Sequence, residues 1–291
     1  MPHTAATSQP EPAQASTKAA PPPEASSLAT GYVPYVEPER PSIFSLKLTQ
    51  LDSGAPVRWV RQGWRDYLCC PKSGLFYGFM FFIMGQVLWA VFKTAPAYVL
   101  GLSASFLLLG PFLCLGLYHA SRSIQQGQEA SLKASMLAWR PTAGAMGIFA
   151  GVLLVLELVW GRASLVIFAV AFSPVPGIED TMSQIFHPDN IGFVISYVLV
   201  GGAFATMIFG MSAIAIPMIM DRQIDAVSAA LTSLRACIQN PGVMFLWGAT
   251  ITTLIGLSML PYFLGLIVMG PIIGHATWHA YREVVPPEAT A

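Results

Sequence analysis

Charge is what this sequence has least of. Only 10% of its 291 residues are charged, and fifteen basic residues balance fifteen acidic ones. Soluble globular domains have about 25% charged residues, so the composition excludes an ordinary soluble domain. The zero net charge also argues against a global basic field for binding nucleic acid. The chain is instead 54% hydrophobic with a mean hydropathy of +0.59, which predicts an integral membrane protein.

Cysteine and the common catalytic motifs are also scarce. The four cysteines form no CxxC pair, and the adjacent Cys69 and Cys70 have poor geometry for a bridge to each other. The sequence has no P-loop, HExxH, GxSxG or CxxCH motif, and no pair of carboxylates placed for acid–base catalysis. We therefore expect no enzymatic activity and no cofactor.

The N-terminal segment has no apolar h-region after a basic start, so it is not a signal peptide. Its richness in Pro, Ala, Ser and Glu predicts a disordered cytoplasmic tail over residues 1–45. A second disordered segment is expected at 286–291. Residues 46–285 between them form the predicted membrane domain.

Six stretches approach the length of about 20 apolar residues that a helix needs to cross a bilayer. They lie at 74–94, 97–119, 143–172, 191–219, 243–260 and 262–280. Lys and Arg gather on one side of these spans, whereas the other side has Lys93 and several acids. The basic side should be cytoplasmic, which places both termini inside and the 173–190 loop outside. The predicted fold is all-α and polytopic, with six transmembrane helices arranged as three hairpins.

An amphipathic segment precedes each hairpin and ends at Pro71, Pro141 or Pro241. Each is predicted to be a helix that lies in the cytoplasmic interface. In the first segment, Asp66 and three arginines are expected on the polar face. Asp221, Arg222 and Asp225 are expected to start the third helix and cap it. The apolar positions that recur at helical spacing are 57, 60, 64 and 67; 132, 136 and 139; and 224, 227, 231, 234 and 238.

An internal repeat is visible in two segments that align without a gap, GPFLCLGLYHASR at 110–122 and GPIIGHATWHAYR at 270–282. Such repeats are common in membrane folds, and we predict three units at about 56–122, 129–222 and 223–282. Residues predicted to have structural or interfacial roles are Gly110, Pro111, Arg122, Gly270, Pro271, Trp278, Arg282, Asp221 and Arg222.

Histidine supplies one candidate site. His275 and His279 lie one helical turn apart, and His119 occupies the repeat position of His279. This spacing can hold a metal or a haem, but Tyr118 and Trp278 beside them favour helix-end anchoring for His119 and His279. We predict that these two are paired anchors and that His275 bonds a neighbouring helix. A haem- or metal-binding redox protein is an alternative.

Glu157 and Arg162 form a second candidate site near the outer end of the third span. Ionisable residues inside a membrane are costly and often mark a transport path. The two are five residues apart, so they do not share a helix face well, and a structural or snorkelling role is the simpler interpretation. A small transporter or channel that uses Glu157 is the alternative.

The stretches WVRQGWRDY, LLLGPFLCLGLYHASR, PMIMDRQID and MGPIIGHATWHAYR resemble those of a bacterial family of integral membrane proteins of unknown function. The resemblance covers about residues 45–285, and some members are labelled as cytochrome c oxidase subunit I. It implies a location in the bacterial cytoplasmic membrane and supplies no activity. An oxidase subunit I is expected to be a larger protein with more membrane histidines. This chain has three histidines near its predicted spans, so the oxidase label does not agree with its residues.

These observations lead us to expect a non-catalytic interaction, assembly or membrane-organising protein. Its expected partners are the lipid bilayer and other membrane proteins, with a respiratory complex as one option and nucleic acid excluded.

Overall fold

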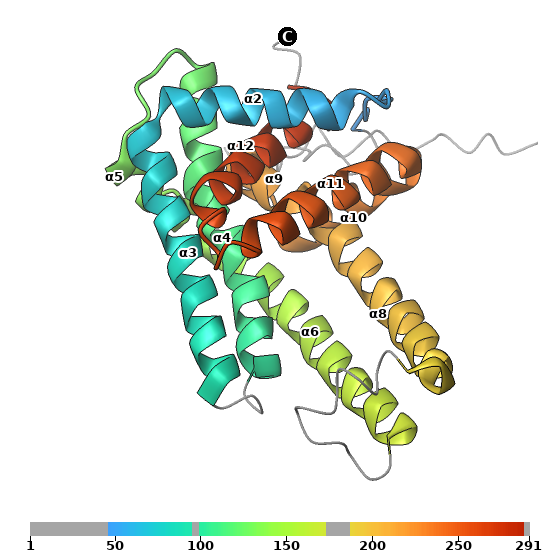
Figure 1. The fold of residues 1–291 in the computed structure, drawn as a ribbon. Coiled ribbons are helices and arrows are strands. Elements are labelled where there is room, and N and C mark those ends of the chain that lie inside the picture. The colour runs from blue at the N-terminus through green and yellow to red at the C-terminus, as the bar shows by residue number, and fades with distance from the viewer. Residues whose placement is uncertain (1–45, 95–98, 173–186, 288–291) are drawn as a thin grey trace, which may run out of the picture. The chain divides into compact units, whose positions relative to one another are not determined.

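The computed structural model describes residues 46–94, 99–172 and 187–287, with side chains at 92 and 94–109 also left undescribed. The predicted tail at 1–45, most of the predicted outer loop and residues 288–291 lie outside these ranges. All regular structure in the described part is helical (Figure 1). The helices are α2 (Ala55–Cys69), α3 (Pro71–Thr94), α4 (Val99–Gln125), α5 (Leu132–Met136), α6 (Ala143–Ala171), α8 (Ile191–Ser212), α9 (Ala215–Arg222), α10 (Ala226–Gln239), α11 (Pro241–Met259) and α12 (Leu266–Val284), with short 3-10 turns at Arg140–Thr142 and Pro188–Asn190.

Four helical stretches in the described part are long and apolar enough to cross a membrane: Pro71–Val91, Leu132–Ala171, Pro188–Arg222 and Pro241–Met259. The prediction of six spans is therefore not confirmed. The second predicted span falls in α4, where side chains are described only from Gly110 onward. The sixth falls in α12, which is not among the four.

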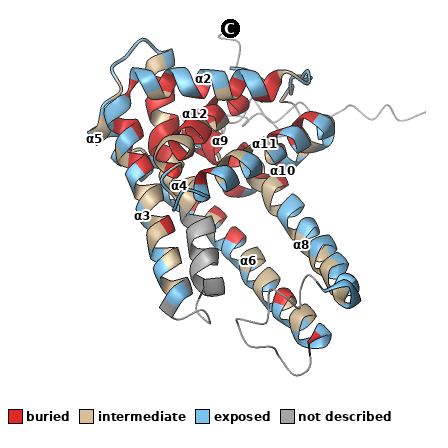
Figure 2. Ribbon diagram, in the orientation of Figure 1, coloured by how far each residue is buried: buried red, intermediate tan, exposed pale blue. Residues whose placement is uncertain are grey.

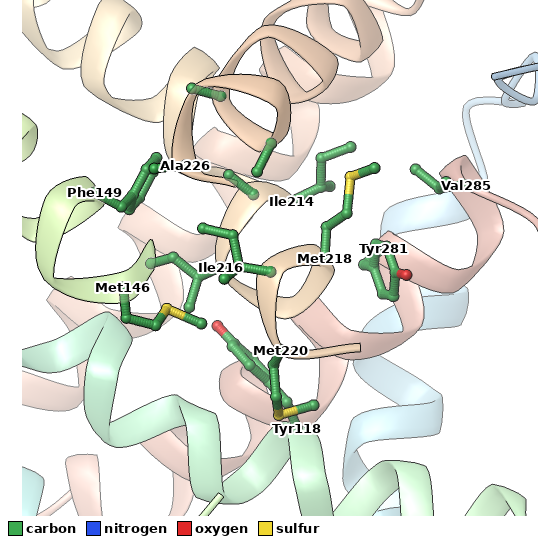
Figure 3. Packing of buried hydrophobic residues seen from close by; sticks show 14 of the residues in the cluster. Tyr118, Met146, Phe149, Ile214, Ile216, Met218, Met220, Ala226, Tyr281 and Val285 are labelled. Carbon is green, nitrogen blue, oxygen red and sulfur yellow. The ribbon is translucent and has the colours of Figure 1, made fainter. Parts of the chain in front are cut away.

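The centre of the described domain is α12, which contacts α2, α3, α4, α9 and α11. Buried residues concentrate around α12 and α9, whereas α6 and α8 are largely exposed where they extend away from this centre (Figure 2). Apolar side chains of α9 fill the core between α4, α6 and α12, and Ile216 and Met218 are almost fully buried (Figure 3). A helix that is surrounded by other helices, as α12 is, can contain polar residues that would be unfavourable in contact with lipid.

Helix α2 approaches α12 closely because Gly63 has no side chain. A Cβ atom at Gly63 would overlap the backbone carbonyl of Ile272 and the backbone of Ala276. Next to this contact, Trp59 packs edge-on against Trp247 of α11, with ring centroids 5.3 Å apart. These contacts bring the polar C-terminal half of α2 against α12.

The first amphipathic helix differs from its predicted orientation in one respect. Its apolar residues Val57 and Trp64 are exposed, but Asp66 is only 7% exposed. Asp66 was expected on the polar face and instead shares the buried face with Ala55, Trp59 and Gly63. In α10 the large apolar residues Val227 and Ile238 are likewise exposed, and small residues such as Ala229 and Ser233 face the core.

The middle amphipathic helix is much shorter than its counterparts. Helix α5 has five residues, and the chain then passes through a turn before Pro141. By contrast, α2 ends at Cys69 and α10 at Gln239, and Pro71 and Pro241 are the first residues of the helices that follow. A proline at that position suits a helix start because no intrahelical N–H bond is lost there.

Candidate functional site

A cluster of four buried polar side chains lies where α2, α4 and α12 meet. Asp66 comes from α2, Ser121 from α4, and His275 and His279 from one face of α12. Ser121 and His275 are fully buried, and Asp66 and His279 are less than 10% exposed. We call these four residues the Asp66 cluster.

The distances within the Asp66 cluster are those of good hydrogen bonds. Oδ2 of Asp66 accepts from Oγ of Ser121 at 2.6 Å and lies 2.8 Å from Nε2 of His279. Oγ of Ser121 also lies 2.7 Å from Nδ1 of His275. Three helices are thus joined through one carboxylate and one hydroxyl group.

The single hydroxyl hydrogen of Ser121 fixes the protonation of His275. Because that hydrogen is donated to Asp66, the Ser121 oxygen must accept from His275, so Nδ1 of His275 carries the proton. Nε2 of His275 is then unprotonated and lies 3.8 Å from Sγ of Cys70. The thiol of Cys70 is also 3.1 Å from the backbone oxygen of Asp66.

Gln125 extends the cluster to the surface and fixes the second histidine. Its Oε1 accepts from Nε1 of Trp278 at 3.0 Å, so its amide nitrogen faces Nδ1 of His279 at 3.2 Å and donates to it. Nδ1 of His279 is therefore unprotonated, and Nε2 carries the hydrogen that is donated to Asp66. Both nitrogens of each histidine, the hydroxyl group of Ser121 and Oδ2 of Asp66 thus have partners in this chain of contacts.

Burial opposes charging of the groups on the His275 side. Desolvation lowers the pKa of His275 to about 4, against a smaller opposing effect of the Asp66 carboxylate. Burial raises the pKa of the Cys70 thiol to about 12. A reactive thiol needs a lowered pKa and an accessible position. Cys70 has a raised pKa and is buried, so it is not arranged as a nucleophile at neutral pH.

A second polar cluster forms around Asp221, at the C-terminal end of α9. Its carboxylate lies 3.3 Å from Nε of Arg122, 3.2 Å from Nη1 of Arg282 and 2.7 Å from the hydroxyl group of Tyr281. Arg222 bonds the same Tyr281 hydroxyl at 3.2 Å. Asp221 is therefore not at the start of α10 as expected. Asp225 is the capping residue there, and its side chain accepts from the backbone N–H of Ser228 at 2.8 Å.

The structure brings some of the predicted residues together and leaves others apart. Gly110, Pro111 and Gly270 line an apolar cavity of about 560 Å³, and Pro271 lies buried inside α12. No described hydrogen bond joins His119 to His279, and Nδ1 of His119 is buried without a partner in the described part of the chain. Glu157 is half-buried and Arg162 exposed on α6, and no ion pair between them is among the described contacts.

Asp66, Ser121 and Gln125 were not among the predicted site residues. Asp66 was assigned to the polar face because apolar side chains alone were used to place the buried one. The buried face of α2 instead consists of Ala55, Trp59, Gly63 and Asp66, at intervals of three and four. The small residues Ala55 and Gly63, two turns apart, are the sequence signal that marks this face. No comparable signal marks Ser121 or Gln125.

The described residues contain no group of three or more His, Cys, Asp or Glu side chains that could hold a metal ion. The hydrogen bonds among the four residues of the Asp66 cluster join α2, α4 and α12.

Comparison with protein-family models identifies a membrane family. Residues 98–221 match the family model described as "Predicted integral membrane protein (DUF2189)". The protein is therefore an integral membrane protein with several helices that are long and apolar enough to cross a membrane. The match supports the resemblance to a membrane family of unknown function, and does not support the oxidase label that some members of the resembling family bear. No curated protein and no solved structure matches the chain.

Proposed function

We propose that the protein is a non-catalytic interaction protein of the bacterial cytoplasmic membrane that binds another transmembrane helix through one face of α6. The observation that carries this proposal is a small-residue face on an exposed span. Gly147 and Gly151 are four residues apart, and Gly144 precedes them by one turn. A Cβ atom at any of the three would meet no atom within 4 Å.

A face of this kind suits helix association in a membrane. Lipid chains are as apolar as leucine, so helices associate through close packing, which glycines four residues apart permit. The neighbouring side chains Ile148, Val152 and Val155 are 63%, 42% and 59% exposed and provide apolar contacts beside the glycines. We call these six residues the α6 glycine face.

The state of the Asp66 cluster supports a non-catalytic role. A general base or nucleophile must come within hydrogen-bond reach of a substrate. Ser121 and His275 are fully buried and bonded to each other, so a substrate would have to displace α2 or α12 to reach them. The transporter and redox alternatives remain predictions, because no described contact of Glu157, Arg162 or His119 favours them.

The proposed location rests on the distribution of basic residues. Lys and Arg gather before the first span and around α5, α9 and α10, which supports a cytoplasmic position for that side of the molecule. Reporter fusions after Ala291 and within 177–189 should report cytoplasm and periplasm respectively. A periplasmic C-terminus would refute this orientation.

The proposed function is tested by replacing Gly147 and Gly151 with leucine. The added side chains separate the helices, so we expect association to weaken by tenfold or more. The matched control replaces Gly192 and Gly202 of α8 with leucine, which also face open space. Association is measured by native mass spectrometry after purification in a mild detergent, and by co-purification of two differently tagged copies.

The two measurements separate a second copy from a different partner. Recovery of both tags indicates self-association, and a defined additional mass indicates another protein. If Gly147→Leu/Gly151→Leu associates as strongly as the wild type, or if the wild type is monomeric in native membranes, the proposal is wrong.

A further inference from the structure

A small polar pocket lies beside Asp221, separate from the α6 glycine face. Its volume is about 200 Å³, and it is lined by Arg122, Gln125, Gln126, Asp221, Trp278 and Arg282. The lining comes from the C-terminal ends of α4, α9 and α12. Two guanidinium groups face one carboxylate, which gives the lining a net charge of +1.

The arginines retain donors beyond those that Asp221 uses. Each guanidinium contacts Asp221 through a single nitrogen in the described structure, Nε for Arg122 and Nη1 for Arg282. A guanidinium has five N–H donors and prefers to bond carboxylate or phosphate through two of them. The side chains are 39% and 30% exposed, so an anion from outside can approach both.

The pocket is also held in shape by its surroundings. The guanidinium of Arg282 lies over the ring of Trp278, 5.8 Å from its centroid. Trp278 is bonded in turn to Gln125. The carboxylate of Asp221 accepts from the hydroxyl group of Tyr281, which is itself bonded by Arg222. These contacts reduce the conformational freedom that the pocket would lose on binding an anion.

The position of the pocket along its helices matches the headgroup level of a membrane. The third candidate span ends at Arg222, next to Asp221. Tyr118 of α4, one turn before Arg122, and Thr277 of α12, next to Trp278, line the apolar cavity. The same helices therefore change from apolar to basic lining within one turn, as they would where acyl chains give way to headgroups.

We propose that this pocket binds a phosphate group, supplied by the headgroup of an anionic phospholipid or by free phosphate. The two arginines bond the phosphate oxygens, and the exposed side of the pocket admits the group. Asp221 orients the arginines and competes with the phosphate for them. If the three residues formed only a structural ion pair, an added phosphate would bind no better there than elsewhere on the basic side.

The first test removes the two positive charges in Arg122→Gln/Arg282→Gln. The matched control is Arg61→Gln/Arg65→Gln, which removes two charges from the exposed face of α2. Native mass spectrometry measures binding of phosphatidylglycerol and phosphatidylcholine to each purified full-length protein. We expect phosphatidylglycerol binding to fall about tenfold in the pocket variant and less than twofold in the control. Equal losses in both would show non-specific attraction and overturn the proposal.

The second test keeps the proposal decidable if the double variant fails to fold. Asp221→Asn removes the competing carboxylate and preserves the size of the side chain, so we expect phosphate binding to strengthen by about tenfold. The probes are inorganic phosphate and phosphatidylglycerol vesicles, with the shift in Tm as the measurement. A response to vesicles alone identifies the lipid, a response to both probes or to inorganic phosphate identifies the free anion as sufficient, and no strengthening with either probe contradicts the proposal.

Discussion

Asp66 gives the clearest measure of what single residues contribute to this fold. Its carboxylate bonds Ser121 and His279, so it links α2 to α4 and to α12. A buried carboxylate is stable only with such partners, because desolvation of an unpaired charge costs several kcal/mol. The sequence identified His275 and His279 as notable, but it could not show that Asp66 and Ser121 lie beside them, since those residues are 55 or more positions apart in the chain.

The two repeat-related histidines should differ in their effect on stability. His279→Ala removes the partner of a buried carboxylate and should destabilise the protein by about 2–4 kcal/mol. His119→Ala removes a ring whose Nδ1 has no partner among the described residues and should cost about 1 kcal/mol or less. Thermal unfolding in detergent measures both. If the two variants lost the same amount of stability, the result would instead favour the prediction from the sequence that His119 and His279 are paired anchors.

Stability should also depend on the protonation of His275. Its folded pKa of about 4 lies below the ordinary value of 6.5, so the unfolded chain binds more protons between these values. Stability is therefore fully present above pH 6.5 and falls by a few kcal/mol in all as the pH drops from 6.5 towards 4. The carboxylates Asp52 and Asp225 have pKa values below 3.8 and titrate below this window.

The variant His275→Gln isolates this effect, because glutamine can still donate to Ser121 but does not titrate. We expect its unfolding temperature to change less than that of the wild type between pH 6.5 and 4. The same pH dependence in both proteins would show that another group is responsible.

At the scale of elements, the sequence predicted the helical periodicity of α2 and α10 well and their contacts poorly. Large apolar residues dominate a periodic pattern, yet Val57 and Trp64 of α2 and Val227 and Ile238 of α10 are exposed. The buried faces consist mainly of small residues, joined in α2 by Trp59. A helix at a membrane surface has two apolar environments, protein and lipid, and hydrophobicity alone does not distinguish them. Residue size does, because helices approach closely where side chains are small.

This difference predicts opposite effects of alanine at two helical glycines. Gly63→Ala places a Cβ atom against the backbone of α12, which cannot move aside easily, and should destabilise the protein by about 1–3 kcal/mol. Gly256→Ala in α11 has nothing within 4 Å and should stabilise the helix by up to about 1 kcal/mol. Thermal unfolding again provides the measurement. A stabilising Gly63→Ala would show that α2 is not packed on α12 as described.

At the scale of the whole molecule, the class of protein followed from composition, and the number of spans did not. Hydropathy identifies helices that face lipid, and four such stretches are present in the described part of the chain. Helix α12 is enclosed by its neighbours and contains His275, His279 and Arg282, so its apolar content is no guide to its position. The sequence analysis singled out α6 for Glu157 and Arg162 and not for its glycines, which the structure shows facing open space.

The central claim, that the α6 glycine face binds another transmembrane helix, is tested most directly by cysteine cross-linking in native membranes. The native cysteines are first replaced with serine. Single cysteines that carry a photoactivatable cross-linker, which reacts with any neighbouring helix, are then placed at Ile148 or Val152 on this face and at Val198 or Leu199 on α8. All four positions are exposed, so a difference in cross-linking between them shows which helix face lies against another helix. We expect a cross-linked species from positions 148 and 152 and none from 198 and 199. No cross-link at 148 and 152, or equal cross-linking at all four positions, would contradict the claim.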